Sequence, residues 1–324
     1  MSFWTLTPNV SQWTLIENIW KDPQPPQLLD DKPIDIAITL SEGIKLQPTK
    51  SACATEYSVF LEKQFSKYSE WRLQLPPVLI SDGISFQKWI GVEARTKEGH
   101  LIGIIFSIPF DKFYAPGFQN DPLTNLGLVD YFCIHPSWRK KGLGTAILHS
   151  LFAATKLVDR KAHVFASEGG LFNLFHKVPS FVKNTYIWRE RIAIGAFKKN
   201  ISISKFNGQL PFKIQDSSKV FIGLGTGSTD IKILSYNTNA IAHIVVKPTY
   251  ERKGNKSVGE VIAWYEEETG LCDFILDSLE LFDIYLAPSN FQQMKKWNRG
   301  ATYAYYPFHF NPEQFSGRQF LRLF

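Results

Sequence analysis

The residues best suited to chemistry in this 324-residue chain form a basic, glycine-containing turn after an apolar run. The run covers residues 128–134, and its nearly continuous apolar character favours a strand that is covered on both faces. Residues 139–144 read Arg-Lys-Lys-Gly-Leu-Gly, and apolar residues at helical spacing continue from there. Free amides at the start of that helix, the positive end of its dipole and three cations would then converge. The pattern predicts an anion cradle that would fit a pyrophosphate.

The turn carries neither of the two common phosphate-binding motifs, since G-x-x-x-x-G-K-[ST] and G-x-G-x-x-G do not occur in it. Its own pattern, Arg139-x-x-Gly142-x-Gly144, resembles the acyl-CoA pyrophosphate loop of the GCN5-related N-acyltransferase (GNAT) superfamily. Upstream, residues 86–95 and 101–109 are two β-prone runs joined by a short polar turn, which predicts a hairpin. The resemblance places the second and third strands of the GNAT fold there.

A narrower resemblance rests on five short blocks in a fixed order. The blocks are Phe3-Trp4 with Thr7-Pro8, and residues 101–109, 130–135, 282–287 and 305–310. Taken together they are similar to blocks of N-myristoyltransferases, which look like two fused acyltransferase folds. The resemblance implies an α+β, GNAT-like fold with mixed twisted sheets flanked by helices. It divides the chain into an arm that contributes to CoA binding (1–50), an acyl-CoA-binding half (51–190) and an acceptor half (191–324).

The same resemblance implies roles for individual residues. The amides of Tyr131 and Phe132 would polarise the thioester carbonyl as an oxyanion hole, a role that needs backbone donors rather than particular side chains. Cys133 and Ile134 would line the same passage. The full set implied in binding myristoyl-CoA, the expected co-substrate, is Ser2, Phe3, Trp4, Cys133, Ile134, Arg139, Lys140, Lys141, Gly142, Leu143, Gly144 and Thr145.

The base that the resemblance implies is the α-carboxylate of Phe324, buried inside the protein. Residues 320–324 are apolar apart from Arg322, unlike a frayed polar terminus. Acyl transfer to an N-terminal glycine requires a neutral amine, and an α-amino pKa of about 8 makes deprotonation by a nearby carboxylate feasible. The implied activity is transfer of a long acyl chain from CoA to the N-terminal glycine of a peptide or protein, a step of lipoprotein biosynthesis.

Three features depart from the family pattern. The acidic acceptor-binding loop expected after the first helix is missing, Arg299-Gly300-Ala301 replaces a Gly-Asp-Gly, and Asp130 stands where asparagine is usual. Phe175 lies where many related acetyltransferases carry a tyrosine acid, and phenylalanine cannot donate a proton. Two alternatives stay open: a GCN5-related N-acetyltransferase acting on an amine or peptide, and a non-catalytic binding or structural protein with this fold.

The charge and cysteine content indicate which classes of partner the protein binds. The chain has 36 Lys and Arg against 30 Asp and Glu, a net charge of +6, but the densest basic cluster is only residues 139–141. This distribution favours a small anion over a nucleic acid. The three cysteines lack C-x-x-C spacing, so we expect no disulfide, no metal site and a reducing compartment.

The chain also lacks the patterns of membrane insertion and export. Its longest apolar stretches fall far short of the roughly 20 residues that a membrane-spanning helix needs. The first residues show neither a basic region nor an apolar core of a leader peptide. We therefore expect a cytoplasmic protein, and we expect it to be a monomer.

The spacing of apolar residues in the rest of the chain predicts further helices and strands. A helix is expected within residues 51–68, and strands are expected over residues 162–166, 220–224, 231–236, 241–247, 261–265, 271–275 and 282–286. Cys133 is explained more simply as a small buried hydrophobic residue than as a nucleophile. His135 has no matching carboxylate within reach in the sequence to pair with it, so we expect it to order the turn rather than to act as a base.

Overall fold

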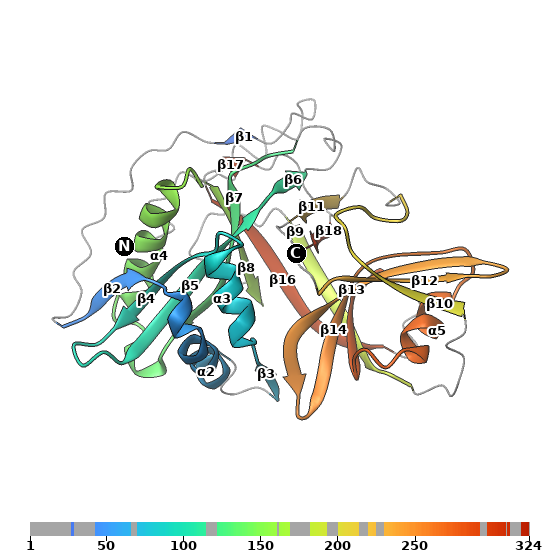
Figure 1. Ribbon diagram of the computed structural model, residues 1–324, viewed down its shortest axis with the longest axis horizontal. Helices are drawn as coiled ribbons and strands as arrows, with labels where there is room; N and C mark the ends of the chain where they lie inside the picture. Colours follow the sequence, from blue (N-terminus) through green and yellow to red (C-terminus); the bar gives the residue numbers. More distant parts are fainter. Residues whose placement is uncertain are drawn as a thin grey trace.

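The computed structural model describes residues 27–28, 43–65, 70–114, 122–160, 162–168, 182–192, 200–213, 220–224, 230–291, 297–308, 310–311 and 319–323. Figure 1 shows two halves side by side, with β9 and β16 running between them. The helices are η2 (Ser51–Cys53), α2 (Ala54–Gln64), α3 (Pro77–Ser85), η3 (Pro136–Trp138), α4 (Leu143–Lys156) and α5 (Leu271–Ser278).

Most strands join one large sheet. Their bounds are β1 (Gln27–Leu28), β2 (Lys45–Pro48), β3 (Trp71–Leu73), β4 (Ile90–Arg95), β5 (Leu101–Phe110), β6 (Lys112–Tyr114), β7 (Leu126–Ile134), β8 (Ala162–Glu168), β9 (Val182–Glu190), β10 (Ile201–Lys205), β11 (Val220–Leu224), β12 (Lys232–Asn237), β13 (Ile241–Lys253), β14 (Lys256–Glu266), β15 (Ile284–Pro288), β16 (Asn298–Phe308), β17 (Phe310–Asn311) and β18 (Gln319–Leu323). Among the described residues, the large sheet has 13 strands in the order β10-β12-β13-β14-β15-β9-β16-β8-β7-β5-β4-β2, with β3 paired to β13.

The first half confirms the elements that the sequence predicts there. β4 and β5 form an antiparallel hairpin whose turn is closed by a hydrogen bond from the amide of Thr96 to the carbonyl of His100, 2.9 Å long. β7 is antiparallel to β5 and parallel to β8, and α4 makes the crossover between β7 and β8. A parallel neighbour requires such a crossover, so the sequence order strand, turn, helix, strand is the order that builds this unit.

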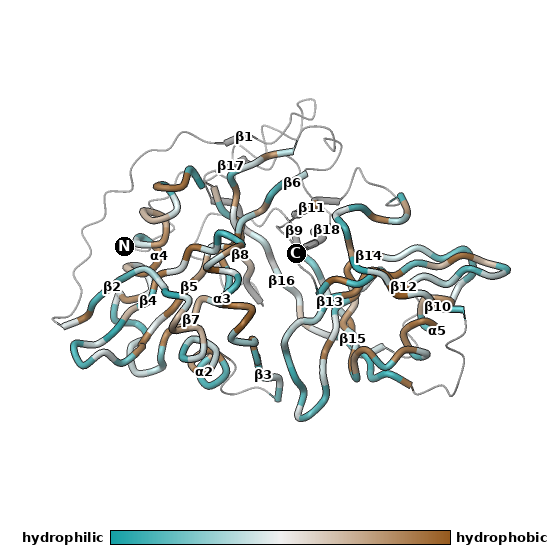
Figure 2. Tube along the Cα trace, viewed as in Figure 1, coloured by the Kyte–Doolittle hydropathy of each residue, from teal (hydrophilic) through white to brown (hydrophobic). Residues whose placement is uncertain are grey.

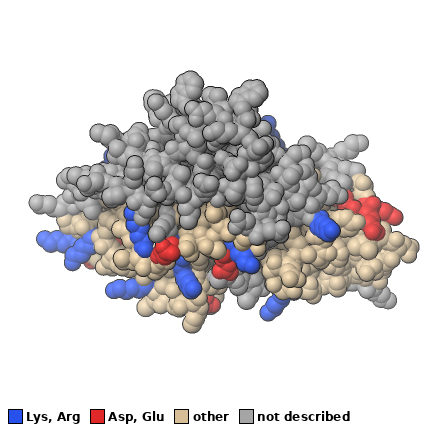
Figure 3. Space-filling view, turned by 90° about the horizontal axis from the view of Figure 1, so that it is seen from above, with Lys and Arg blue, Asp and Glu red and all other residues tan. Residues whose placement is uncertain are grey.

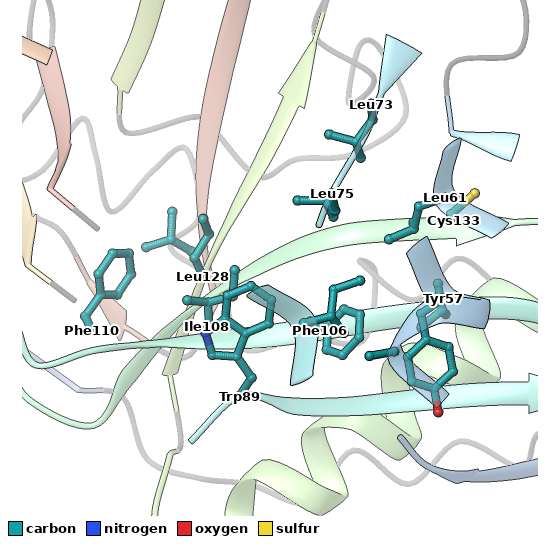
Figure 4. Close-up of a cluster of buried hydrophobic side chains, with 14 of the residues drawn as sticks. Tyr57, Leu61, Leu73, Leu75, Trp89, Phe106, Ile108, Phe110, Leu128 and Cys133 are labelled. Atoms are coloured by element: carbon teal, nitrogen blue, oxygen red, sulfur yellow. The ribbon is translucent and has the colours of Figure 1, made fainter. Parts of the chain in front are cut away.

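Helices cover both faces of the first half. α2 and α3 bury Tyr57, Leu61 and Ile80 in a cluster with Ile104 and Phe106 of β5, and Figure 4 shows side chains of this cluster. α4 buries a second cluster on the opposite face, made by alternate residues of the same strands. Figure 2 shows the apolar stretches of α4 in brown. The periodicities of 3.6 and 2 residues in the sequence therefore account for both layers.

The second half is built mainly from the β12-β13-β14 ribbon. Residues 231–236, 241–247, 261–265 and 282–286 were expected to be strands, and β12 to β15 confirm them. Residues 271–275 were also expected to form a strand, and that prediction is wrong, since they begin α5. Glu266 explains the difference, because its Oε2 accepts hydrogen bonds from the amides of Gly270 (3.2 Å) and Cys272 (2.9 Å) at the start of this helix.

Register places α5 on the same face of the large sheet as α4. Tyr303 of β16 pairs with Asn184 of β9, and paired residues share a face. Tyr303 packs against the α2–α3 cluster, whereas Ile187, an odd number of residues from Asn184, packs in the cluster of α5. The two halves thus carry a helix on the same side, while α2 and α3 lie on the other side.

A small sheet covers that other side in the second half. It has the order β18-β11-β6, with β18 parallel to β11. β18 contacts β9 and β14, and Ile222 of β11 packs against the buried Val245 and Ile262. The last described strand of the chain therefore lies over the middle of the molecule, as Figure 1 shows. Among the described residues, no helix is both long and apolar enough to cross a bilayer.

Candidate acyl-CoA site

The strand β7 is interrupted by a bulge at Tyr131 and Phe132. On one side of the bulge Asp130 pairs with Phe106, and on the other Cys133 pairs with Ile104, so two residues of β7 lie opposite one residue of β5. Tyr131 has a φ of 52°, in the left-handed region that non-glycine residues rarely adopt. A bulge of this kind turns backbone groups out of the ladder, and such bulges are common beside active sites.

The bulge lies where β7 and β8 separate. Their parallel pairing runs from Leu126 with Ala162 to Val129 with Phe165 and ends there. Both strands continue, β7 to Ile134 and β8 to Glu168. The ladder between β7 and β8 therefore stops just before residues 130–134, at the position of the bulge.

The turn after β7 is held by its own side chains. The amide of Ser137 donates to Nδ1 of His135 at 3.3 Å, and Nε of Arg139 donates to the carbonyl of Ile134 at 3.0 Å. His135 orders the turn, as the sequence suggested. Lys140 and Gly142 have φ values of 61° and 78°, and these two left-handed residues reverse the chain into α4. The amides of the first turn of α4 then lack partners within the helix.

Space and charge at this helix start suit a large anion. A Cβ added at Gly142 would meet nothing within 4 Å, so the backbone there is open. Nζ of Lys141 lies 5.1 Å from the centroid of the Trp138 ring, which orients one cation of the turn. Figure 3 shows that, over the face it displays, Lys and Arg are interspersed with Asp and Glu. The cations of the turn lie close in sequence to the amides of the first turn of α4, which have no acceptor within the helix.

Aromatic packing fixes the bulge from the α2–α3 side. The ring of Tyr131 stacks on Trp89 with centroids 6.0 Å apart, and it meets Phe106 edge-on at 6.5 Å. Trp89 and Phe106 are both buried. Such pairs stabilise by about 1 kcal/mol each beyond burial, and this offsets the strain of a positive φ at Tyr131. Phe132 points the other way, with its Cζ 3.3 Å from where a Cβ at Gly144 would lie.

Cys133 and Ile134 lie on opposite faces of β7. Cys133 is buried in the cluster with Leu61, beside which Figure 4 shows it, while Ile134 packs on the α4 side. Burial raises the pKa of the Cys133 thiol to about 12, so the thiol is protonated at neutral pH. A neutral buried thiol is a poor nucleophile, and this agrees with Cys133 as a hydrophobic residue.

A polar floor joins the two halves, and no pattern in the sequence predicts it. On the face that carries Tyr303, the hydroxyl of Tyr186 donates to Oε1 of Glu260 at 2.9 Å, and Oε2 of Glu260 lies 3.6 Å from Nζ of Lys247. Tyr186 and Tyr303 meet edge-on at 5.8 Å. Lys247 and Asn184 are buried. Tyr186 lies 74 residues from Glu260 and 117 residues from Tyr303 in the chain, so no local pattern could reveal the cluster.

The structure brings together the proposed oxyanion residues Tyr131 and Phe132 and the turn residues from Arg139 to Thr145. Ser2, Phe3, Trp4 and Phe324 lie outside the described residues, as does most of the predicted arm 1–50. β18 ends at Leu323, next to Phe324. Within the described part of the chain, no group of three or more His, Cys, Asp or Glu could hold a metal ion.

The sequence matches neither a protein-family model nor a curated protein. Solved structures do match the fold. The structure of Saccharomyces cerevisiae N-myristoyltransferase with bound myristoyl-CoA is 12% identical, covers 95% of this chain and 92% of its own, and has a TM-score of 0.62. A second structure of that enzyme, with bound myristoyl-CoA and inhibitors, is 14% identical over 95% and 89% of the two chains, with a TM-score of 0.58.

A tandem GNAT protein from the clavulanic acid biosynthesis pathway is 11% identical over 82% of this chain and 98% of its own, with a TM-score of 0.51. The chain therefore has a GNAT-like acyl-CoA N-acyltransferase fold made of two halves. Within that class, its fold is the one seen in N-myristoyltransferases, at low sequence identity.

Proposed function

We propose that the protein is an N-acyltransferase that moves a long acyl chain, myristoyl in the first instance, from CoA to the N-terminal glycine amine of a peptide or protein. One observation supports this above the others. β7 leaves β8 at the position where the bulge sets Tyr131 at a φ of 52°, and the strand then leads through a cationic turn into α4. The oxyanion donors Tyr131 and Phe132 and the pyrophosphate cradle that begins at Arg139 would thus be separated by only six residues, 133–138.

In the proposed complex, amides of the α4 start and the charges of Arg139, Lys140 and Lys141 would bind the CoA phosphates. The positive end of the helix dipole adds to this attraction. Ser2, Phe3 and Trp4 of the proposed arm would lie against the CoA. Residues 51–190 would form the acyl-CoA half, and residues 191–324 the acceptor half.

The proposed reaction is direct attack by the glycine amine on the thioester carbonyl. The negative charge on the carbonyl oxygen would be stabilised by the amides of Tyr131 and Phe132, and each such donor is worth on the order of 10²–10³ in rate. The C–S bond then breaks, CoA leaves as a thiolate, and the amide forms. The proposed base for the ammonium proton is the α-carboxylate of Phe324, and β18 contacting β9 and β14 brings the preceding residues to the junction.

We propose a cytoplasmic location as well. All three cysteines are free thiols, and Cys133 and Cys272 are buried, as suits a reducing compartment. The polar floor of Tyr186, Glu260 and Lys247 is the candidate acceptor surface, since it lies on the face that β18 covers in the junction between the halves.

The test is acyl transfer by a chain extended after Phe324 by a Gly-Ser-Gly-Ser segment. Mass spectrometry would follow myristoyl transfer to glycine-initiated peptides, and calorimetry would follow myristoyl-CoA binding. We expect the extension to abolish transfer and to leave binding within about twofold. Full transfer by the extended chain would rule out the terminal carboxylate as base. Preferential transfer of acetyl would favour the acetyltransferase alternative, and binding without any CoA release would favour a binding module.

A further inference from the structure

Asp130 engages one of the two amides that the proposed oxyanion hole needs. Its Oδ1 accepts a hydrogen bond from the amide of Tyr131, 2.8 Å long. Both residues are half-buried, so the contact lies in a medium that screens charge less than bulk water. Hydrogen bonds from an amide to an ionised carboxylate are among the stronger ones. The Tyr131 donor is therefore occupied in this structure.

A thioester oxyanion and the Asp130 carboxylate would compete for the same N–H. Both are negative, and at hydrogen-bond distance from one donor they would lie within about 5 Å of each other, where like charges repel strongly in a partly buried site. Phe132 would then be left as the single donor of the pair. A transfer reaction at full rate requires the carboxylate to leave the Tyr131 amide.

We propose that Asp130 is a gate on the oxyanion hole, opened by the acceptor; this rests on the proposed function. In the absence of acceptor the carboxylate holds the Tyr131 amide, and a bound acyl-CoA has one oxyanion donor only. The ammonium of an incoming N-terminal glycine attracts the carboxylate, which rotates about its Cα–Cβ bond and frees the amide. Asp130 acts as a positioning residue, since it controls a donor rather than reacting itself.

The gate has a chemical purpose in a thioester enzyme. Water that reaches the same carbonyl would add to it, break the C–S bond and release free fatty acid and CoA without any product amide. Withholding one donor until the acceptor is present slows this hydrolysis and leaves transfer fast. The strained φ of Tyr131 and its packing against Trp89 keep the amide in place while the side chain of Asp130 moves.

The test compares Asp130→Asn and Asp130→Ala with the wild-type chain. Asparagine keeps an acceptor for the Tyr131 amide and removes the charge, while alanine removes both. CoA release from myristoyl-CoA is followed by chromatography with and without a glycine peptide. We expect acceptor-independent hydrolysis to rise about tenfold or more in Asp130→Ala, following the value of one oxyanion donor. It should rise less in Asp130→Asn, because the asparagine oxygen still accepts a hydrogen bond from the Tyr131 amide. The KM for the peptide should rise in both variants because the attracting carboxylate is gone.

Asp111→Asn is the matched control, because Asp111 is an exposed carboxylate just beyond β5, outside the bulge. It should leave both rates unchanged. Hydrolysis that stays at the wild-type level in both Asp130 variants, with thermal unfolding unchanged, would overturn the gate. Calorimetry separates the two proposals: a wild-type chain that binds no acyl-CoA removes the proposed function, whereas binding and transfer with unchanged hydrolysis removes only the gate.

Discussion

Nε of Arg139 donates a hydrogen bond to the carbonyl of Ile134, 3.0 Å away across the turn that follows β7. The contact ties the end of the bulged strand to the cationic segment before α4. Its consequence is that Arg139 shapes the proposed phosphate cradle as well as adding charge to it.

Arg139→Lys should separate these two contributions. Lysine keeps the charge but loses the planar guanidinium that reaches the Ile134 carbonyl, and the two side chains are not equivalent at such sites. We expect CoA affinity, measured by calorimetry, to fall about tenfold. Lys141→Arg is the control, since arginine keeps both the charge and the stacking on Trp138, and its affinity should match the wild type. Equal affinities for all three proteins would mean that Arg139 acts through charge alone.

Gly142 and Gly99 form a matched pair of left-handed glycines. Their φ values are 78° and 90°, and a Cβ at either would meet nothing within 4 Å. Replacing either by alanine should lower the free energy of unfolding by about 1 kcal/mol, the cost of a Cβ in this conformation. Only Gly142→Ala should also weaken CoA binding, by tenfold or more, because its amide belongs to the proposed cradle. The idea fails if Gly99→Ala, in the β4–β5 turn, weakens CoA binding as much.

Cysteine reactivity should follow burial. The pKa of Cys133 is raised to about 12 by burial, and burial also raises the pKa of Cys272, aided by Glu266. Cys53 is the half-exposed thiol of the three. Iodoacetamide at pH 8 should therefore modify Cys53 first, with peptide mass spectrometry as the readout, and Cys133→Ala should retain acyl transfer within about threefold. Rapid labelling of Cys133, or loss of transfer in Cys133→Ala, would point to a nucleophilic role.

Lowering the pH should lower the free energy of unfolding of the first half, because Glu93 becomes protonated. Burial works to raise the pKa of this fully buried carboxyl, but hydrogen bonds from Arg95 (2.7 Å) and Gln47 outweigh it and hold the pKa below its ordinary value of 4.5. A depressed pKa means that the stabilisation is complete above the ordinary value and is lost as the pH falls through the lowered one.

Glu93→Gln tests this expectation. At pH 7 the variant should lose about 2 kcal/mol of unfolding free energy, the value of hydrogen bonds to a charged group. Its stability should also fall less steeply than that of the wild type below pH 4.5. Denaturant titrations at several pH values measure both effects, with the exposed Glu98→Gln as control. If the stability of Glu93→Gln falls as steeply below pH 4.5 as that of the wild type, another group is responsible for the acid sensitivity.

The sequence predicts those elements whose pattern lies within a few neighbouring residues. The β4–β5 hairpin, β7 and α4 follow from alternation, apolar runs and helical spacing within a few residues. The proposed phosphate turn follows for the same reason, since its cations and glycines are contiguous. The bulge at Tyr131 was not visible, because it depends on the register of β7 against β5, which partner strands set together.

Two short segments show where local patterns fail. Residues 271–275 form an apolar run that fits a buried strand or a helix face equally well, and the cap by Glu266 decides for a helix. Pro76 and Pro77 follow the segment in which the first helix is expected, but α2 already ends at Gln64. They also begin α3, with Pro77 at its first position, where proline is favoured.

The acceptor side is the least predictable part of the candidate site. Tyr186, Glu260 and Lys247 come together only because β9, β15, β14 and β13 are neighbours in the large sheet. Neither composition nor spacing brings such distant residues together. The resemblance to N-myristoyltransferases predicted the two-half fold, and the solved structures confirm that part.

The bulge at Tyr131 and the turn before α4 are proposed to bind a long-chain acyl-CoA, and the decisive measurement is competitive calorimetry of myristoyl-CoA against acetyl-CoA. Each buried methylene contributes about 0.8 kcal/mol, so even partial burial of the longer chain predicts at least about 100-fold tighter binding of myristoyl-CoA. Equal affinities for the two thioesters, or no heat with either, would rule out a binding site for a long-chain acyl-CoA.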